Sequence, residues 1–357
     1  MQVEARTAQA GTRIADHATP FVFNCWYIAA LGSEVGRDLR QRWLLGRDVL
    51  LFRRQDGTPA AIQNRCPHRS APLSMGRLVG DTVVCGYHGF TFDASGTCIR
   101  VPSQERVPRN LRIQSYPAVE RGPFIWVWMG DAERADPASI PAQDWLTDAR
   151  FDHVEGYFHV GCNYLSLHEN VLDLTHVPFL HGEHNATLQF AEQPADVSVE
   201  GNTVTVSRNE YDRAPPPHYA ASIGRSDIRV NRLSVSQFLS PAFHGAQTIV
   251  ELREPSPGER DRYLFKIIHA FTPESATSTH YFWSNARDSS VGDPEVSEII
   301  RRRSTKVYSE DVEILEAAER IRQGESRSDF REVSVMADGP AMQARRITAR
   351  LVSAELE

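Results

Sequence analysis

The chain has 357 residues, a formal net charge of −7 and 41% hydrophobic residues, values that are ordinary for a soluble globular protein. This length predicts two domains. The negative charge and the lack of a basic patch argue against a nucleic-acid binder, and no apolar run approaches a membrane span. The N-terminus lacks a hydrophobic signal core, and five cysteines do not suggest a disulfide scaffold, so we expect a cytoplasmic protein.

The first third of the chain is predicted to form a small all-β domain. Residues 1–20 are predicted to be a polar arm, and residues 21–130 alternate short apolar strands with turn signals. Residues 48–53 form one such strand, and residues 124–129 form another, with aromatic side chains on one face. Residues 131–148, which are richer in Ala, Asp and Pro, are predicted to be a connector.

Two mixed pairs of ligand residues lie in this domain. They are Cys66-Pro67-His68 and Cys85-Gly86-Tyr87-His88, each on a predicted loop, with sixteen residues between them. Such pairs are typical of metal sites. One hypothesis is a structural zinc site, and the other is a [2Fe–2S] centre in which histidines replace cysteines on one iron. Zinc fingers keep two histidines together on a helix, so the mixed pairing favours the iron–sulfur centre.

Residues 149–357 are predicted to form a second, larger domain that mixes long helices with antiparallel strands. Residues 262–271 and 279–284 are predicted to pair as a hairpin around a Thr-Pro-Glu loop. The proline-rich stretch 214–218 is predicted to be a loop without assigned chemistry.

The segment 163–184 has the highest density of candidate functional residues in the chain. Its leucines predict a partly buried helix, where ionisable groups are costly unless they are paired or hold a metal. Glu169, Asp173 and His176 follow one another at spacings of four and three, so they are predicted to share a helical face.

A helix break in this segment can bring two histidines together. Pro178 removes a backbone donor, and His181 follows His176 by five positions, which a straight helix would turn to another face. With the helix interrupted there, both imidazoles can converge. His184 could replace His181 if the break falls elsewhere.

A carboxylate far downstream is the candidate third ligand. A helix is predicted from the cap Asp293-Pro294 to Gly324, and Asp311 falls inside its apolar stripe. The stripe consists of Ile300, Val307, Ile314, Ala318 and Ile321. His176, His181 and Asp311 would form the two-histidine, one-carboxylate triad that binds ferrous iron with open positions. The alternative is that Asp311 is exposed or paired with Arg303 or Lys306.

Four motifs carry a family resemblance. They are Cys66-Pro-His-Arg69, Cys85-Gly-Tyr-His-Gly89, the segment from Glu169 through Asp173 and His176 to His181, and the tail Ser309–Glu316. In these motifs the chain resembles the catalytic subunits of Rieske non-haem iron oxygenases, most closely the vanillate O-demethylase and dicamba demethylase group. The resemblance covers residues 26 to about 320. Phe90 departs from it, because a tryptophan commonly stands there.

The resemblance implies an α+β fold, with an N-terminal all-β Rieske domain followed by a catalytic domain in which helices wrap an antiparallel sheet (helix-grip type). It implies that Cys66 and Cys85 bind one iron of the cluster, and His68 and His88 the other. It also supports Asp311 as a ligand of the mononuclear iron, beside His176 and His181.

Two further roles follow from the resemblance. Asp173 would not bind metal but would bridge a cluster histidine of one subunit and an iron-ligand histidine of its neighbour, in a homotrimer. Asn170 is similar to the asparagine often found close to the iron, with an ordinary surface amide as its alternative.

The electrons are expected to come from another protein. The chain has no G-x-G-x-x-G after a strand, so we expect no NAD or flavin on it. The sequence also has no second cysteine cluster of ferredoxin type. A separate reductase or ferredoxin is therefore the expected donor.

Candidate substrate contacts are fewer and less specific. His269 is similar in position to a substrate-contacting histidine of the demethylase group. Trp283, with Phe265 and Phe282, could line an apolar pocket, although strand aromatics are usually core. Arg232 and His244 are weak candidates for binding a substrate carboxylate.

The expected function is that of a terminal monooxygenase component, using O2 to hydroxylate or O-demethylate a small methoxylated or carboxylated aromatic compound. Ring cis-dihydroxylation would use the same iron site and is the first alternative. The others are an electron-transfer Rieske protein without mononuclear iron and a zinc-stabilised binding module.

Overall fold

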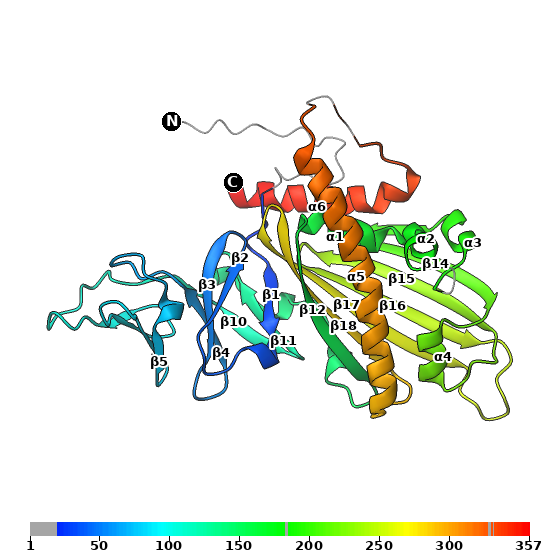
Figure 1. The fold of residues 1–357 in the computed structure, drawn as a ribbon, viewed down its shortest axis with the longest axis horizontal. Helices are drawn as coiled ribbons and strands as arrows, with labels where there is room; N and C mark the ends of the chain where they lie inside the picture. Colours follow the sequence, from blue (N-terminus) through cyan, green and yellow to red (C-terminus); the bar gives the residue numbers. More distant parts are fainter. Residues whose placement is uncertain (1–19, 183–184, 328–329, 331) are drawn as a thin grey trace.

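A computed structural model of the chain describes residues 20–182, 185–327, 330 and 332–357. The predicted arm, except for Pro20, and His184 lie outside the described residues. A β-rich N-terminal part lies beside a larger part built on one broad sheet, with a long helix across that sheet (Figure 1). No helix in the described ranges is long and apolar enough to cross a membrane.

Three small antiparallel sheets make up the N-terminal part, which confirms its predicted all-β character. In sheet order, their strands are β1 Trp26–Leu31, β11 Phe124–Trp128 and β10 Ala118–Arg121; β2 Arg40–Leu44, β3 Arg47–Arg53, β4 Pro59–Gln63 and β9 Ser115–Tyr116; and β5 Arg77–Val79, β6 Thr82–Val84, β7 Thr91–Phe92 and β8 Cys98–Arg100.

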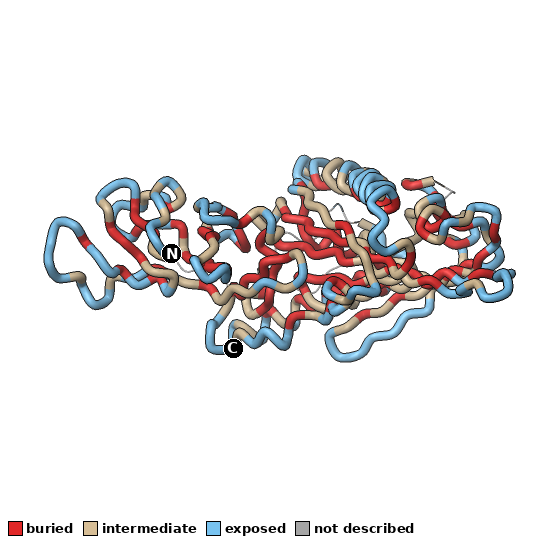
Figure 2. Tube along the Cα trace, turned by 90° about the horizontal axis from the view of Figure 1, so that it is seen from below, coloured by how far each residue is buried: buried red, intermediate tan, exposed pale blue. Residues whose placement is uncertain are grey.

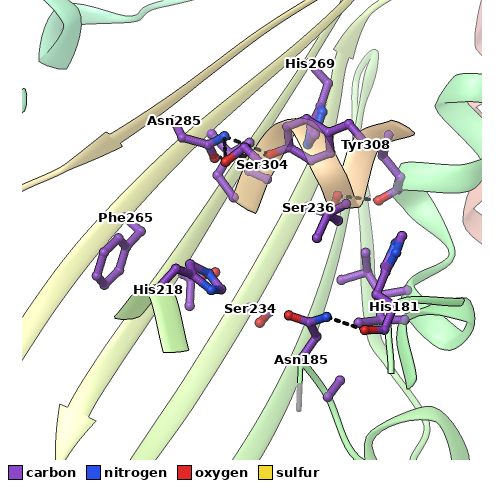
Figure 3. Close-up of a pocket in the computed structure, with 18 of the residues that line it drawn as sticks. His181, Asn185, His218, Ser234, Ser236, Phe265, His269, Asn285, Ser304 and Tyr308 are labelled. Carbon is purple, nitrogen blue, oxygen red and sulfur yellow. Dashed lines mark hydrogen bonds between the residues drawn. The ribbon is translucent and has the colours of Figure 1, made fainter. Parts of the chain in front are cut away.

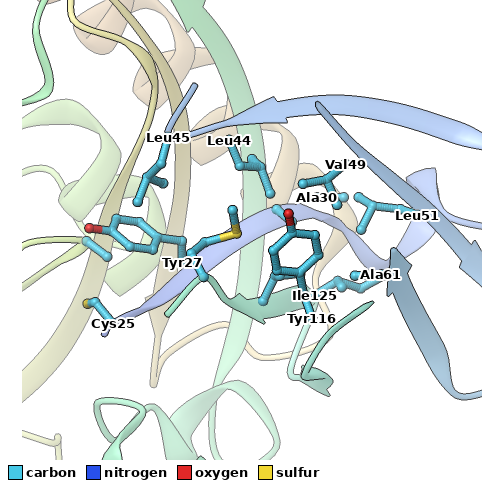
Figure 4. Packing of buried hydrophobic residues seen from close by; sticks show 14 of the residues in the cluster. Cys25, Tyr27, Ala30, Leu44, Leu45, Val49, Leu51, Ala61, Tyr116 and Ile125 are labelled. Carbon is cyan, nitrogen blue, oxygen red and sulfur yellow. The ribbon is translucent and has the colours of Figure 1, made fainter. Parts of the chain in front are cut away.

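The two faces of strand β11 serve different cores. Ile125 and Val127 pack with Tyr27 in the core of the N-terminal part (Figure 4). The aromatic face predicted for this strand packs the other way, where Trp126 meets Phe243 of the large sheet with ring centroids 5.6 Å apart. Because successive strand side chains point to opposite faces, this alternation joins the two parts of the molecule through a buried aromatic layer.

A seven-stranded antiparallel sheet forms the centre of the larger part, and many of its residues are buried (Figure 2). In sheet order, its strands are β12 Asp152–Val160, β18 Ser278–Arg287, β17 Arg262–Ser275, β16 Phe243–Leu252, β15 Val230–Ser240, β14 Thr203–Arg213 and β13 Asp196–Glu200. The helices are α1 Tyr164–Leu172, α2 Val177–Leu180, α3 Leu188–Glu192, α4 Pro217–Ile223, α5 Pro294–Gly324 and α6 Gly339–Leu356.

Two local predictions in this part need correction. The hairpin of β17 and β18 is confirmed, but the Thr-Pro-Glu stretch is not its loop. Thr272 and Pro273 pair with β18, Glu274 lies at an irregularity within strand β17, and the chain turns only at residues 276–277. The stretch 214–218 is a loop only in part, since Pro217 begins helix α4, in keeping with the preference of proline for a first helical turn.

Helix α5 begins and ends where the sequence predicted. The Asp293 carboxylate accepts hydrogen bonds from the amides of Glu295 and Val296, and Gly324 is the last helical residue. The predicted apolar stripe was wrong in its second half, because Ile314 and Ile321 are 51% and 73% exposed. Seven-residue spacing drifts by about 20° per heptad around a straight helix, which carries these two side chains off the face that packs on the sheet.

The segment that carries the candidate metal-ligand histidines is interrupted earlier than predicted. Helix α1 ends at Leu172, and Asp173 then caps a short 3₁₀ turn by accepting from the Thr175 amide at 2.9 Å. Glu169, Asp173 and His176 therefore do not share one helical face. Pro178 does not break the helix but lies in the first turn of α2. The two histidines still converge, because the break at Asp173 reorients everything that follows.

The C-terminal helix is fixed to α1 by a buried ion pair. Arg345 of α6 donates from Nη2 to the Glu169 carboxylate, and both side chains are about nine-tenths buried. Burial raises the pKa of Glu169, and Arg345 offsets part of that shift. Removing one member of such a pair leaves a buried, uncompensated charge.

We therefore expect Arg345→Met to lower the free energy of unfolding by about 3–5 kcal/mol. Thermal and urea unfolding would measure this, and the neighbouring Arg346→Met is the matched control, because Arg346 is exposed. The double variant Glu169→Gln/Arg345→Met should recover part of the loss. Equal stability of Arg345→Met and Arg346→Met would show that the ion pair is not important for stability.

Candidate metal centres and active-site cavity

The two Cys/His loops have the same backbone geometry. In the first, the Cys66 amide donates to the Ala71 carbonyl at 2.9 Å, and the Ser70 amide donates to the Cys66 carbonyl at 2.9 Å. The second loop repeats both bonds with Cys85, Gly89 and Phe90, at 2.8 and 3.0 Å. Ser70 and Gly89 occupy equivalent positions with positive φ, 58° and 71°. Each turn places its cysteine inward and its histidine outward.

The side chains of these loops fit a two-iron centre. Cys66 and Cys85 are each 2% exposed, and burial raises the pKa of Cys66 to about 11, so a thiolate here needs metal to stabilise it. His68 and His88 are exposed at the surface, with ring centroids 4.5 Å apart. Phe90 stacks flat on His68, at 4.7 Å and 4°, so the position keeps an aromatic ring against this imidazole although it is not a tryptophan.

A second constellation lies under helix α5. The Asp311 Oδ1 atom is 3.4 Å from Nε2 of His176 and 3.2 Å from Nε2 of His181, and three ligand atoms of these residues lie within 4.8 Å of one another. Asp311 is 7% exposed. Burial acts to raise the pKa of its carboxyl group, but the two imidazoles outweigh burial and hold that pKa well below its usual range. The alternative pairing of Asp311 with Arg303 or Lys306 does not occur: Lys306 lies 3.9 Å from Glu310, and Arg303 binds Asn185.

The outer nitrogens of the two imidazoles test whether a metal fits. The Nδ1 atom of His176 lies 2.6 Å from the Asp173 carbonyl, and that of His181 lies 2.8 Å from the Glu310 carboxylate. Both partners are acceptors, so each Nδ1 carries a proton, and each Nε2 faces Asp311 Oδ1. When the Nε2 atoms are unprotonated, their lone pairs and the carboxylate converge on one point that a cation can occupy. The triad therefore fits ferrous iron.

Glu310 was missed by the sequence analysis, which treated it only as part of the family-like tail. It adjoins Asp311 on α5, and a carboxylate behind a ligating histidine orients the ring and raises its basicity. The signal available in the sequence was the Glu-Asp pair itself, but nothing in it indicated which histidine Glu310 would meet.

We expect Glu310→Ala to weaken ferrous iron binding by about 10–100-fold. Glu310→Gln, whose amide oxygen can still accept from the imidazole, should retain most of the affinity. Iron titration of metal-depleted protein measures both, with Glu313→Gln on the exposed face of α5 as the control. Unchanged affinity in Glu310→Ala would exclude this supporting role.

An apolar cavity of about 200 Å³ opens from the triad between α5 and the sheet (Figure 3). Strand side chains at alternate positions line it, among them Arg232, Ser234 and Ser236 of β15 and Phe265, Ile267 and His269 of β17. An apolar cavity of about 150 Å³ can take up benzene. The cavity therefore suits a single substituted aromatic ring.

The structure shows which of the remaining predicted residues line the cavity. Asn170, Phe265 and His269 line the cavity. The His269 Nδ1 atom lies 2.6 Å from the Tyr281 hydroxyl, and burial lowers the pKa of His269 to about 4. His218, from the stretch without assigned chemistry, also lines the cavity.

Other candidates lie elsewhere. Trp283 is absent from the described lining, because its ring lies over Gly156 of β12, where a Cβ atom would come within 2.2 Å of it. Phe282 packs in the aromatic layer between the two parts. His244 is fully buried beneath Ser236, 2.6 Å from its hydroxyl. Arg232 lines the cavity but is ion-paired with Glu210.

Comparison with known families agrees with these sites. Residues 25–117 match the Rieske [2Fe-2S] domain, and residues 160–354, more than half of the chain, match the vanillate O-demethylase oxygenase C-terminal domain. The chain belongs to the Rieske non-haem iron oxygenases. This oxygenase is thus an oxidoreductase that uses a [2Fe–2S] cluster, a mononuclear iron and O2.

Its relatives support the same family. The chain is 31% identical to a vanillate O-demethylase oxygenase subunit of Pseudomonas sp. (strain HR199 / DSM 7063), over 94% of this chain and 96% of the relative. It is 33% identical to the toluene-4-sulfonate monooxygenase iron-sulfur subunit TsaM1 of Comamonas testosteroni, over 94% and 98%. The crystal structure of dicamba monooxygenase bound to 3,6-dichlorosalicylic acid superposes with a TM-score of 0.87 at 30% identity, over 94% and 99%.

Proposed function

We propose that this oxygenase removes the methyl group from a small methoxylated aromatic compound, as the terminal component of a multicomponent system. The observation that carries the proposal is that the triad of His176, His181 and Asp311 opens directly into an apolar cavity sized for one ring. The relatives named for vanillate and toluene-4-sulfonate act on single-ring aromatic compounds, which supports the same substrate class.

The proposed site assignments follow the geometry. His176, His181 and Asp311 hold the mononuclear iron, and Asn170 lies on the cavity wall beside it. The cluster is held by Cys66 and Cys85 on one iron and by His68 and His88 on the other. His269 contacts the substrate from strand β17.

The proposed reaction inserts one oxygen atom of O2 into a methyl C–H bond. Bound ferrous iron supplies the activation of dioxygen. Two electrons from a separate reductase or ferredoxin and two protons convert the second oxygen atom to water. The resulting hemiacetal breaks its C–O bond and yields a phenol and formaldehyde. The apolar cavity walls position the ring and exclude bulk water from the iron.

Assembly as a homotrimer is part of the proposal. In Figure 1 the small sheet that contains β5 lies at the opposite end of the molecule from helix α2, which precedes His181. The candidate cluster loops lie next to this small sheet. That separation supports electron delivery from the cluster of one subunit to the iron of its neighbour. The exposed positions of His68 and His88 suit such a contact. Asp173 is the proposed bridge between a cluster histidine of one subunit and an iron-ligand histidine of its neighbour.

We propose the domain division 21–130, 131–148 and 149–357, which the separate sheets support. We also propose a cytoplasmic location. The five cysteines are free and buried, and ligand thiolates must stay reduced, as they do in that compartment.

The test is turnover of a panel of methoxylated aromatic acids and neutral aromatic ethers with a Rieske reductase and NADH. The expected result is one formaldehyde and one phenol per O2 consumed. Formation of a cis-diol without formaldehyde would replace demethylation by ring dihydroxylation. Cluster reduction without substrate-dependent O2 consumption would leave only an electron carrier.

A further inference from the structure

Three of the imidazoles that line the cavity differ in what their Nδ1 atoms meet. The Nδ1 atoms of His176 and His181 face acceptors, a backbone carbonyl and a carboxylate. The Nδ1 atom of His269 instead lies 2.6 Å from the hydroxyl group of Tyr281, which can donate as well as accept. Because the partner at one ring nitrogen decides which nitrogen of a neutral imidazole carries the proton, His269 need not present the same kind of atom to the cavity as the other two.

The hydroxyl group of Tyr281 has one place to donate its hydrogen. Tyr281 is 2% exposed, and among the described residues His269 Nδ1 is the hydroxyl's single hydrogen-bond partner. Burial raises the pKa of Tyr281 well above its ordinary value, so the phenol keeps its proton. A buried donor without an acceptor is unfavourable, so the hydroxyl donates to Nδ1. The proton of the neutral His269 ring therefore lies on Nε2.

The His269 ring is neutral and held in place. Burial lowers its pKa to about 4. The Tyr308 ring meets it edge-to-face with centroids 5.1 Å apart (Figure 3), and the hydroxyl of Tyr308 is in turn bonded to Asn285 at 3.2 Å. These contacts hold the imidazole plane, whereas the bond from Tyr281 decides which nitrogen carries the proton.

The Nε2 atom of His269 is open to the cavity. No residue in the described ranges hydrogen-bonds to it, and it is not among the unpaired polar atoms that are sealed inside the protein. His269 is 6% exposed and lines the cavity, so the open side of Nε2 is the cavity side. His269 thus adds a neutral N–H donor to a mostly apolar wall, the reverse of His176 and His181, whose Nδ1 atoms carry the proton.

We propose that Tyr281 is a positioning residue that keeps the proton of His269 on Nε2, and that this N–H binds an oxygen acceptor on the substrate ring, such as a carbonyl or carboxylate group. The proposal deepens the proposed function and rests on it. A methoxy oxygen is a weak acceptor, because its lone pair is delocalised into the ring, so the acceptor is a second substituent. A ring without one would leave the Nε2–H unpaired in an apolar cavity, which is unfavourable.

The test compares ligands that accept with ligands that mainly donate. The ketones are 3-methoxyacetophenone and 4-methoxyacetophenone, and the amines are 3-methoxyaniline and 4-methoxyaniline. Each is titrated without O2 into the iron-loaded, cluster-containing wild type, Tyr281→Phe, His269→Leu and the double variant, which gives Kd without turnover. Tyr27→Phe is the matched control, because it removes another fully buried hydroxyl, which donates to the Val22 carbonyl in the N-terminal part.

The wild type should bind the better-fitting ketone about 3–10-fold more tightly than the corresponding amine, as expected for one neutral hydrogen bond. In Tyr281→Phe this preference should largely disappear, because the proton can move to Nδ1 and Nε2 can then accept from the amine. The KM for the ketone, from formaldehyde release, should rise while kcat stays within about two-fold of the wild type. Tyr27→Phe should keep the wild-type preference.

The double variant separates positioning from general damage. If Tyr281 acts through His269, Tyr281→Phe should change nothing further once His269→Leu has removed the preference. Equal binding of ketone and amine by the wild type, or an unchanged preference in His269→Leu, would overturn the donor, and this comparison holds even if Tyr281→Phe does not fold. A folded Tyr281→Phe with the wild-type preference would overturn the role of Tyr281.

Failure of the proposed function would look different. Absence of formaldehyde from every compound of the wider aromatic panel would count against demethylation, whatever the ratio of the Kd values. A lost preference together with normal formaldehyde release would overturn only the role of His269 and Tyr281 in substrate choice.

Discussion

His176→Ala should lose the mononuclear iron and keep the cluster. Anaerobically purified wild type should contain about three irons and two sulfides per chain, and the variant about two irons with both sulfides. Removing His176 leaves His181 and Asp311, which is too few protein ligands for a stable ferrous site. The red-brown cluster spectrum should be unchanged, and formaldehyde release should fall below detection.

The matched control is His159→Ala, because His159 lies on β12 with its side chain 51% exposed and pairs with Glu274. It should retain both metals and wild-type turnover. Two irons in both the wild type and His176→Ala under iron-replete conditions would exclude the mononuclear site. Zinc without sulfide in the wild type would exclude both centres.

Asp173→Asn should keep both metals and lose the electron path between them. Asparagine caps a helical turn as well as aspartate does, so the bond from the Thr175 amide should persist, and the His176 Nδ1–H still meets the backbone carbonyl of residue 173. Only the carboxylate charge proposed to bridge two subunits is removed. We expect steady-state turnover to fall by about 10–100-fold.

Rapid mixing separates this effect from damage to either site. When chemically reduced Asp173→Asn is mixed with O2 and substrate, its cluster should reoxidise more slowly than that of the wild type by the same factor. Asp196→Asn, on the exposed strand β13, should behave as wild type. Wild-type reoxidation in Asp173→Asn would exclude the bridging role, and loss of iron would mean that the carboxylate supports the metal site.

The sequence predicted best where local rules decide the structure. Helix α5 was predicted to its terminal residues because Asp293 caps it and Pro294 fits its first turn. The all-β character of the N-terminal part followed from strand alternation between turns. The break in the iron-ligand segment was placed at Pro178 and actually occurs at Asp173, because a side-chain cap ended the helix before the proline was reached.

The residues that could not be predicted act through tertiary contacts. Glu310 meets His181 across 129 positions of sequence, and Arg303 meets Asn185 across 118. No local pattern identifies such partners. Trp283 was predicted as a candidate substrate contact. Strand alternation indicates the face on which a side chain lies, but it does not indicate where along the sheet the cavity is. Gly156, on the neighbouring strand, has no side chain and leaves the space in which the indole lies.

The two centres also differ in how the chain must fold to create them. The cluster loops lie within residues 66–90, in sheets whose strands are near neighbours in sequence, so closing this site requires only short loops. The iron triad joins His176 and His181 to Asp311, and it exists only after the large sheet has formed and α5 has docked on it. The residues of the candidate cluster site are therefore close together in the sequence, whereas the candidate mononuclear site is complete only after most of the chain has folded. A shortage of iron after cluster assembly would then give coloured protein without the proposed catalytic iron.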